Sequence, residues 1–200
     1  MAPTLLAGTD RSNPLNYAFV PNYWRNPARW ESRNDGGSIL IFTDGAAPDN
    51  GRPGVRAGCG VVAGPSPDSC FAFRLEHDVF HQLTSNRAEL RAVEAAIKAD
   101  WKKEGIKTIV IATDSEYVAK GATEWIRVWR DGSGWWVVER DNMDLWDRLM
   151  KAIEDKEREG ICVEFYLIDR IWNLADPHAK RAAVSLFILG MFRDGYTSLM

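Results

Sequence analysis

The sequence predicts an α/β protein in which one mixed β-sheet carries helices on both faces. Three short apolar segments come first, and further apolar segments then alternate with stretches in which apolar residues recur every three or four positions. Meandering strands followed by strand–helix units favour this arrangement. The length of 200 residues, with 46% hydrophobic and 26% charged residues, is typical of one globular domain with extensions.

Each element of this fold has its own signal in the sequence. The uniformly apolar segment 107–113, KTIVIAT, is typical of a central strand that is buried on both faces. Leu90, Val93 and Ile97 recur at steps of three and four, which predicts a helix over 84–101. The other predicted strands and helices lie at 39–43, 57–64, 70–76, 114–129, 141–159 and 161–168, and a last helix begins near Asp176.

Two flanking segments are predicted to lie outside the domain, which spans residues 38–184. Residues 1–37 contain four prolines and several aromatic residues without a clean period, which predicts an N-terminal extension. Residues 185–200 are predicted to form an apolar C-terminal extension. The N-terminal extension is expected to pack on the domain through Tyr17, Phe19, Tyr23, Trp24 and Trp30.

Composition narrows the class of protein further. No apolar run approaches the roughly 20 residues that span a bilayer, and the N-terminus lacks the pattern of a signal peptide. The three cysteines are scattered, so neither a disulfide framework nor a zinc motif is expected. We therefore expect a soluble intracellular protein, with the compartment left open. The net charge of −3 weakly opposes a nonspecific nucleic-acid binder but allows an enzyme with a local basic patch and bound metal ions.

Four acidic residues stand at similar places in the predicted fold. Asp44 and Asp114 each follow an apolar strand, Glu89 lies one turn into a helix, and Asp176 stands at the start of the last helix. Groups just beyond strand ends gather in one crevice of an open sheet. Four carboxylates in one crevice repel each other unless a cation neutralises them, and hard divalent cations such as Mg²⁺ take oxygen ligands. The pattern indicates two-metal phosphodiester cleavage.

Each acid taken alone also fits a structural role. Asp44 with Gly45 could form a turn, and Glu89 could close a capping box that starts at Asn86. Asp114 and Asp176 could each cap a helix. For any single residue the structural role is at least as common, but all four together favour a shared site.

Four segments carry a resemblance to a known family. TDGAAPDNG, TSNRAEL, ATDSEYVAKGATEWIRVW and DNMDLW closely resemble motifs of ribonuclease H of the cellular type 1, in the expected order from about Ser38 to Ala183. The resemblance implies a ribonuclease H-like fold with a five-stranded mixed sheet flanked by helices on both faces. It also implies an endonuclease that cuts the RNA strand of an RNA–DNA hybrid with two Mg²⁺ or Mn²⁺ ions.

The same resemblance assigns roles to the four acids. It implies that Asp44 bridges both ions, that Glu89 and Asp114 hold the ion at the leaving group, and that Asp176 holds the ion carrying the attacking water. By motif position, Asn50 resembles a minor-groove contact to the RNA strand.

Further substrate contacts follow from the resemblance. Ser85 and Asn86 resemble readers of the 2′-hydroxyl, the group that distinguishes RNA from DNA. Such readers do not require DNA on the opposite strand, so double-stranded RNA is an alternative substrate.

Four further residues resemble contacts to the DNA strand. Thr84 and Asn142 resemble a pocket for a DNA phosphate, and Trp125 and Trp129 resemble aromatic residues that line the DNA channel. The spacing of four residues between Trp125 and Trp129 equally fits two side chains that pack in the core from one face of a helix.

The last acidic segment departs from the family pattern. Arg170 stands where the family usually has a histidine, and an arginine cannot shuttle a proton near pH 7 but can bind phosphate. Pro177 disfavours helical geometry for Asp176, which predicts that Asp176 is an extended N-cap with Pro177 as the first helical residue. His178 is expected to be a surface residue, because two helical steps carry it about 200° around from Asp176.

The segment 123–141, where the family often has a basic handle, also departs in its charge. It contains three arginines and four acids, and 3 − 4 gives a charge of −1. We therefore expect weaker hybrid binding with a shallow salt dependence. These departures leave a second function open, in which a ribonuclease H-like domain binds nucleic acid or protein with weak or lost catalysis.

Overall fold

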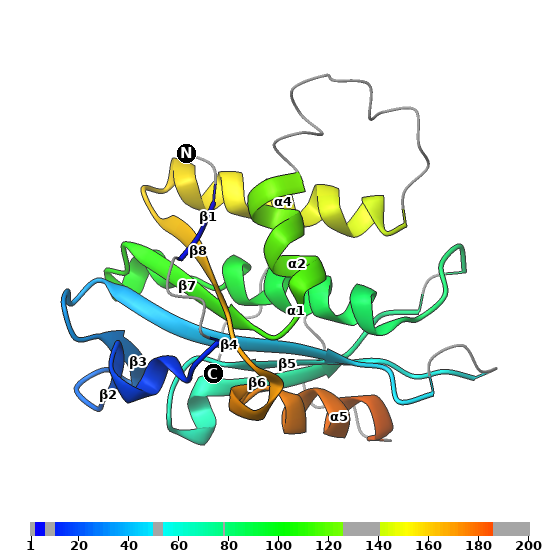
Figure 1. The fold of residues 1–200 in the computed structure, drawn as a ribbon, viewed down its shortest axis with the longest axis horizontal. Helices are drawn as coiled ribbons and strands as arrows, with labels where there is room; N and C mark the ends of the chain where they lie inside the picture. Colours follow the sequence, from blue (N-terminus) through cyan, green and yellow to red (C-terminus); the bar gives the residue numbers. More distant parts are fainter. Residues whose placement is uncertain (1–2, 7–10, 50–53, 78, 126–140, 186–200) are drawn as a thin grey trace.

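The computed structural model describes residues 3–6, 11–49, 54–77, 79–125 and 141–185, and it confirms the α/β class with one mixed sheet. The sheet has eight strands among these residues (Figure 1). They are β1 (Thr4–Leu5), β2 (Phe19–Asn22), β3 (Arg29–Ser32), β4 (Ser38–Ala46), β5 (Gly58–Val62), β6 (Cys70–Arg74), β7 (Thr108–Thr113) and β8 (Cys162–Leu167).

The five predicted strands form the centre of this sheet. β4 runs parallel to β7, with Ile39 opposite Ile109, and antiparallel to β5, with Asp44 opposite Gly60. β8 continues the sheet parallel to β7, and β6 continues it antiparallel to β5. Because β4, β7 and β8 are parallel, their C-terminal ends lie at the same edge of the sheet, where an α/β protein places its site.

The other three strands come from the segment 1–37. β1 pairs parallel with β8, and β2 and β3 form an antiparallel pair in which β3 also contacts β4. The sequence did not reveal these strands, and in β2 Pro21 interrupts the usual pattern of a strand. Pro21 is tolerated in β2 because this strand pairs only with β3 in the described part of the chain, so a missing N–H can face outward.

The aromatic residues of this segment divide into two groups. Phe19 is buried, and Trp30 packs against the cluster that contains it, as expected. Packing was wrongly expected for Tyr17, Tyr23 and Trp24, which are exposed. Trp24, in the turn between β2 and β3, is 99% exposed.

Helices cover both faces of the sheet (Figure 1). Three helices lie on one face: α1 (Ser85–Lys98), α2 (Glu116–Lys120) and α4 (Met143–Arg158). α5 (Asp176–Val184) lies on the other face. Short 3-10 turns occupy Pro14–Asn16, Pro67–Ser69, Trp101–Glu104 and Arg170–Trp172, and a π-helical turn, Gly121–Trp125, follows α2.

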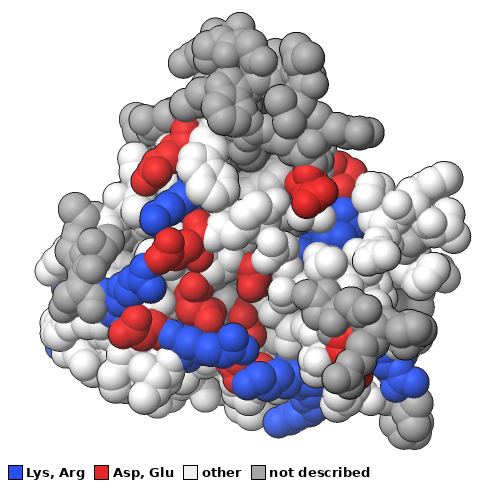
Figure 2. Space-filling view, turned by 45° about the vertical axis from the view of Figure 1, so that its right-hand side comes forward, with Lys and Arg blue, Asp and Glu red and all other residues white. Residues whose placement is uncertain are grey.

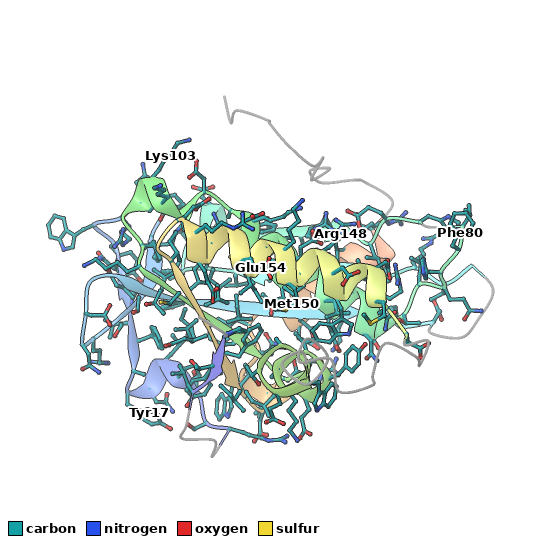
Figure 3. The ribbon with its side chains drawn as sticks, turned by 90° about the horizontal axis from the view of Figure 1, so that it is seen from above. Tyr17, Phe80, Lys103, Arg148, Met150 and Glu154 are labelled. Atoms are coloured by element: carbon teal, nitrogen blue, oxygen red, sulfur yellow. The ribbon has the colours of Figure 1, made fainter. Side chains whose placement is uncertain are left out.

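The central strands are buried on both faces, as their uniformly apolar sequences predict. Ile39 and Ile41 of β4 face the core under α1 and α4, whereas Leu40 and Phe42 face the opposite cluster, and all four are fully buried. Seen from above, α4 crosses the sheet with Met150 near its middle (Figure 3). In the described part of the chain, no helix has the length and apolar character needed to cross a membrane.

Candidate active site

The four predicted acids converge at the C-terminal edge of the central strands. Asp44 lies in β4, Asp114 directly follows β7, Glu89 lies in α1, and Asp176 is the first residue of α5. Burial, followed by the charges of Asp114, Asp176 and Glu89, raises the pKa of Asp44 to about 7 against the opposing charge of Arg170. Figure 2 shows the face where acidic side chains gather, bordered by basic ones. The carboxylates are therefore close enough to oppose each other's ionisation.

Glycines bring the helices close enough to the strands to build this cluster. Gly45 follows Asp44, and a Cβ atom there would collide with the backbone of Ala88 and Glu89 in α1. On the other face, a Cβ at Gly60 would lie 2.6 Å from the carbonyl oxygen of Ala175, just before α5. Because these positions have no side chain, Glu89 and Asp176 approach Asp44 from opposite faces of the sheet.

None of the four acids has the turn or capping role that each could have alone. Asp44 lies within β4 rather than after it, so it forms no turn. Thr84 caps α1, and Ser115 caps α2 by accepting from the Val118 N–H at 3.3 Å. Ala175 holds the N-cap position of α5.

Three of the acids are held by neighbouring donors. Ser115 Oγ donates to Glu89 Oε2 at 2.5 Å, and Asn173 Nδ2 donates to Asp114 Oδ1 at 2.6 Å. Burial nevertheless raises the pKa of Glu89 above its ordinary value. Burial also opposes ionisation of Asp176, but hydrogen bonds from Lys180 and Arg170 outweigh it and lower its pKa.

The fourth acid, Asp44, lacks such support on one oxygen. Asp44 is 4% exposed, and its Oδ2 atom has no hydrogen-bond partner among the described residues. A buried carboxylate oxygen without a donor is costly, which is the environment that a bound cation relieves. The donor set of four carboxylates fits a hard divalent cation.

The arrangement is nevertheless not a closed metal cage. Within the described ranges, no group of three or more His, Cys, Asp or Glu side chains is arranged to hold a metal ion as it stands. One cause is visible, since donors from the protein occupy oxygens of Glu89, Asp114 and Asp176.

Comparison with known proteins decides the family. The RNase H family profile matches residues 36–165, which is more than half of the chain. The chain belongs to the RNase H family. The matched region contains Asp44, Glu89 and Asp114 and ends before Asp176.

Individual relatives agree with this assignment. The chain is 40% identical to "Ribonuclease H" of Verminephrobacter eiseniae over 116 residues, covering 56% of this chain and 66% of that protein. It is 37% identical to "Ribonuclease H" of Proteus mirabilis over 150 residues, covering 74% and 87%. The match to "Ribonuclease H1" of Mus musculus, at 36% identity, covers 50% of this chain and 33% of that protein. The chain thus spans about two thirds of the length of the Verminephrobacter relative and a third of the length of the mouse relative.

Solved structures share the RNase H fold. LC9-RNase H1, described as a type 1 RNase H with the type 2 active-site motif, has a TM-score of 0.57 at 24% identity, covering 74% of this chain and 72% of that one. The foamy viral protease-reverse transcriptase in complex with RNA/DNA hybrid has a TM-score of 0.55 at 22% identity, covering 72% and 20%. At these identities the likeness shows the fold alone.

The RNase H motif residues near α1 and α4 form a connected polar group. Thr84 Oγ1 accepts from the Arg87 N–H at 3.3 Å, and Arg87 Nη1 donates to Asn142 Oδ1 at 3.3 Å. Asp144 holds Arg87 through two hydrogen bonds of 2.8 and 2.6 Å. Thr84 and Asn142 are therefore joined through Arg87, whose role the sequence did not suggest.

The other predicted substrate residues have different surroundings. Ser85 and Asn86 stand in the first turn of α1, where Ser85 is partly exposed and Asn86 is exposed. Trp125 is 37% exposed and packs edge-on against Tyr117, with ring centres 6.1 Å apart. Asn50 and Trp129 lie outside the described residues.

The start of α5 corrects one expectation. Asp176 is the first helical residue and Pro177 the second, so Asp176 is not an extended N-cap. A proline in the first helical turn is allowed because the N–H it lacks would have no partner within the helix. The shift places the Asp176 side chain one helical turn before Lys180, which binds it.

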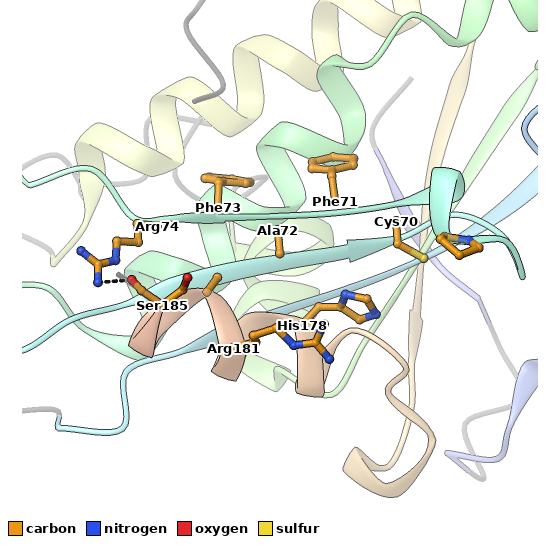
Figure 4. Close-up of a pocket in the computed structure, with 10 residues that line it drawn as sticks. Cys70, Phe71, Ala72, Phe73, Arg74, His178, Arg181 and Ser185 are labelled. Carbon is orange, nitrogen blue, oxygen red and sulfur yellow. Dashed lines mark hydrogen bonds between the residues drawn. The ribbon is translucent and has the colours of Figure 1, made fainter. Parts of the chain in front are cut away.

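His178 faces away from the acids, as expected. It lines a groove of about 400 Å³ between α5 and β6, together with Arg181 and Arg74 (Figure 4). Burial and then the charge of Arg181 lower the pKa of His178. His178 therefore offers no substitute for the histidine that Arg170 replaces.

The sequence reasoning missed the polar residues that hold the acids. Ser115 directly follows Asp114, Asn173 precedes Asp176 by three positions, and Lys180 follows it by four. Only the Lys180 spacing carries a general signal, because residues four apart on a helix lie side by side.

Proposed function

We propose that this chain is a metal-dependent ribonuclease H-type endonuclease that cleaves the RNA strand of RNA–DNA hybrids. The observation that carries the proposal is the buried carboxylate of Asp44, with one oxygen unpaired and three other acids around it. Membership in the RNase H family supports it, since relatives named Ribonuclease H share this region.

The four acids are the proposed ligands of two Mg²⁺ or Mn²⁺ ions. Asp44 would contact both ions, Glu89 and Asp114 the ion at the leaving oxygen, and Asp176 the ion at the attacking water. Bound divalent ions supply an activated water and stabilise the leaving oxygen. Ser115 and Asn173 orient Glu89 and Asp114, and such outer hydrogen bonds fix ligand geometry in metal sites.

The surrounding polar residues are the proposed substrate contacts. Ser85 and Asn86 stand partly or fully exposed at the start of α1, which suits contacts to the 2′-hydroxyls of RNA. Thr84, which accepts from the Arg87 backbone N–H, and Asn142, which accepts from the Arg87 guanidinium, suit a phosphate of the DNA strand.

The remaining contacts follow the family motifs. Asn50 is assigned to the minor groove, Trp125 and Trp129 to the DNA channel, and Arg170 to a phosphate near the scissile bond. Of these, Trp125 and Arg170 have exposed surface in the described part of the chain.

One cleavage assay tests the proposal. Labelled RNA–DNA hybrid, double-stranded RNA and single-stranded RNA are incubated with wild type, Asp44→Asn and the matched surface variant Asp155→Asn, in Mg²⁺, Mn²⁺ or EDTA. We expect wild type and Asp155→Asn to cut the hybrid with metal only, and Asp44→Asn to fall to the level of the EDTA reaction. Cutting of double-stranded RNA would broaden the substrate, and no cutting of any substrate by wild type would refute the proposal.

Arg170 supports a second candidate, a nucleic-acid-binding module with weak or lost catalysis. A guanidinium cannot carry the proton that a histidine would carry at this position. The two candidates differ in one measurement, because a binding module retains the hybrid in a mobility-shift experiment without cutting it. A shallow slope of affinity against salt is expected in either case, given the acidic segment 123–141.

A further inference from the structure

Asp176 differs from the other three acids in what holds it. Arg170 donates to Asp176 Oδ1 through Nε at 3.1 Å and through Nη2 at 2.7 Å. Lys180 Nζ lies 2.7 Å from the second oxygen, Oδ2. Both oxygens of this carboxylate are thus occupied by positively charged groups.

The other acids of the site accept hydrogen bonds from neutral groups or from none, although the charge of Arg170 also acts to lower the pKa of Asp44 and of Glu89. Hydroxyl and amide groups hold Glu89 and Asp114, and Asp44 Oδ2 has no partner among the described residues. A neutral donor can keep its hydrogen bond while a metal binds the remaining lone pairs of the carboxylate. A positively charged side chain at each oxygen occupies the position of the metal and also repels it.

We propose that Arg170 and Lys180 form a displaceable lock on Asp176, which a divalent cation must open before this carboxylate can become its ligand. The inference rests on the proposed function, because it assumes that the four acids bind metal. Lys180 is thereby assigned a role at the site as a positioning residue, and Arg170 a role beyond contact with substrate.

The geometry allows the lock to open. The side chain of Arg170 is 62% exposed and that of Lys180 is 55% exposed, whereas that of Asp176 is 18% exposed. Long exposed side chains can swing into water at small cost, because ion pairs with solvent-exposed partners are only weakly favourable. The acid remains in place at the start of α5 while its two partners leave.

The two positively charged side chains belong to different elements, so the lock does not depend on one of them alone. Lys180 lies one turn along α5, and Arg170 lies in the 3-10 turn that precedes this helix. The backbone of the turn is fixed from outside, since the Asp169 N–H donates to the Arg11 carbonyl oxygen at 3.0 Å. Removing one of the two side chains by mutation therefore leaves the other bound to its own oxygen of Asp176.

Calorimetric titration of the full chain with Mn²⁺, in the absence of nucleic acid, tests the lock. The variants are Lys180→Ala, Arg170→Ala, their combination and the conservative Lys180→Arg. Arg181→Ala is the matched control, because Arg181 lies on the same helix but faces the groove beside β6 (Figure 4). Circular dichroism checks that each variant is folded.

We expect each alanine variant to bind Mn²⁺ about two- to fivefold more tightly and the combination about tenfold more tightly. Lys180→Arg and Arg181→Ala should match wild type. A merely structural role for Lys180 predicts unchanged or weaker binding in Lys180→Ala.

The outcomes separate this inference from the proposed function. Unchanged or weaker binding by the folded double variant overturns the lock, even where Asp44→Asn abolishes Mn²⁺ binding and so supports the metal site. Binding that survives intact in Asp44→Asn overturns the metal site itself and the lock with it. Absence of binding in both wild type and the double variant overturns both.

Discussion

Two groups of buried charges lie on the same helix, α1, and they are compensated in opposite ways. Towards the end of the helix, the fully buried carboxylate of Glu94 is surrounded by cations. Arg91 Nη1 lies 3.4 Å from Glu94 Oε2, an ion pair without a hydrogen bond, and Lys98 and Arg148 lie 3.0 and 3.1 Å from Glu94 Oε1. Arg91 is itself 1% exposed and also pairs with Glu76 at 2.8 Å. This cluster joins α1 to α4 and to the segment after β6.

Five residues earlier, the same helix presents Glu89 to a group that is short of positive charge. Asp44 has an unpaired oxygen and raised pKa because burial and three neighbouring carboxylates oppose its ionisation. The difference separates buried charges that the fold compensates from buried charges that it leaves uncompensated. Charges with partners in the chain hold elements together, whereas charges without them destabilise the metal-free protein.

The largest expected effect comes from breaking the compensated group. Arg91→Ala should reduce the free energy of unfolding by about 3–5 kcal/mol, because it leaves Glu94 buried with less compensation. Urea denaturation measures this change. Lys103→Ala, at an exposed position, is the control and should show no measurable shift. A loss below about 1 kcal/mol for Arg91→Ala would contradict the comparison.

Removing a charge from the acidic site should instead increase the free energy of unfolding. The carboxyl pKa of Asp44 is raised in the folded protein, so the folded state binds its proton more tightly than the unfolded state does. In EDTA, the contribution of Asp44 to stability is therefore favourable at low pH and is lost as pH rises from about 4 to 7. Asp44→Asn should be more stable than wild type by about 2–4 kcal/mol at pH 8, and the difference should shrink towards pH 5.

Thermal unfolding of the two proteins between pH 5 and pH 8 measures this difference. Comparing them at each pH removes the titration of all other groups. A constant difference across the pH range would show that Asp44 does not titrate as its surroundings indicate.

A smaller effect is expected from the neutral residues that hold the acids. Asn173 is buried, donates to Asp114 and to the Thr43 carbonyl oxygen, and accepts from the Ala175 N–H. Asn173→Ala should cost about 1–3 kcal/mol of stability, and about tenfold or more in Mn²⁺ affinity. Ser66→Ala, far from the acids, tests whether loss of a polar side chain alone lowers metal affinity. Unchanged affinity in Asn173→Ala would remove Asn173 from the site.

The sequence predicted those parts of the molecule whose signals are local. β4 and β7 are uniformly apolar because they are buried on both faces, and acids beside their ends stand out against that background. β2 could not be predicted from its own residues, because Pro21 interrupts the strand pattern and the segment is a strand only through its pairing with β3. A strand that depends on its neighbour leaves little trace in its own residues.

The same distinction applies to the site. The acids could be found because carboxylates at strand ends form a recognisable pattern. Asn173 could not, because its contacts with Thr43 and Asp114 join residues 130 and 59 positions apart, which no spacing rule anticipates. The structure also moved Asp176 from the cap position into the first turn of α5, since Ala175 adopts helical geometry.

Gly45 carries a consequence for how such a site can change over evolution. A Cβ atom at this position would meet the backbone of Ala88 and Glu89. The close approach of β4 and α1 therefore requires a glycine here. In the proposed metal site, a substitution there would alter the space that the acids offer to a cation while leaving all four in the sequence. Selectivity among ions would then depend partly on a residue with no functional group.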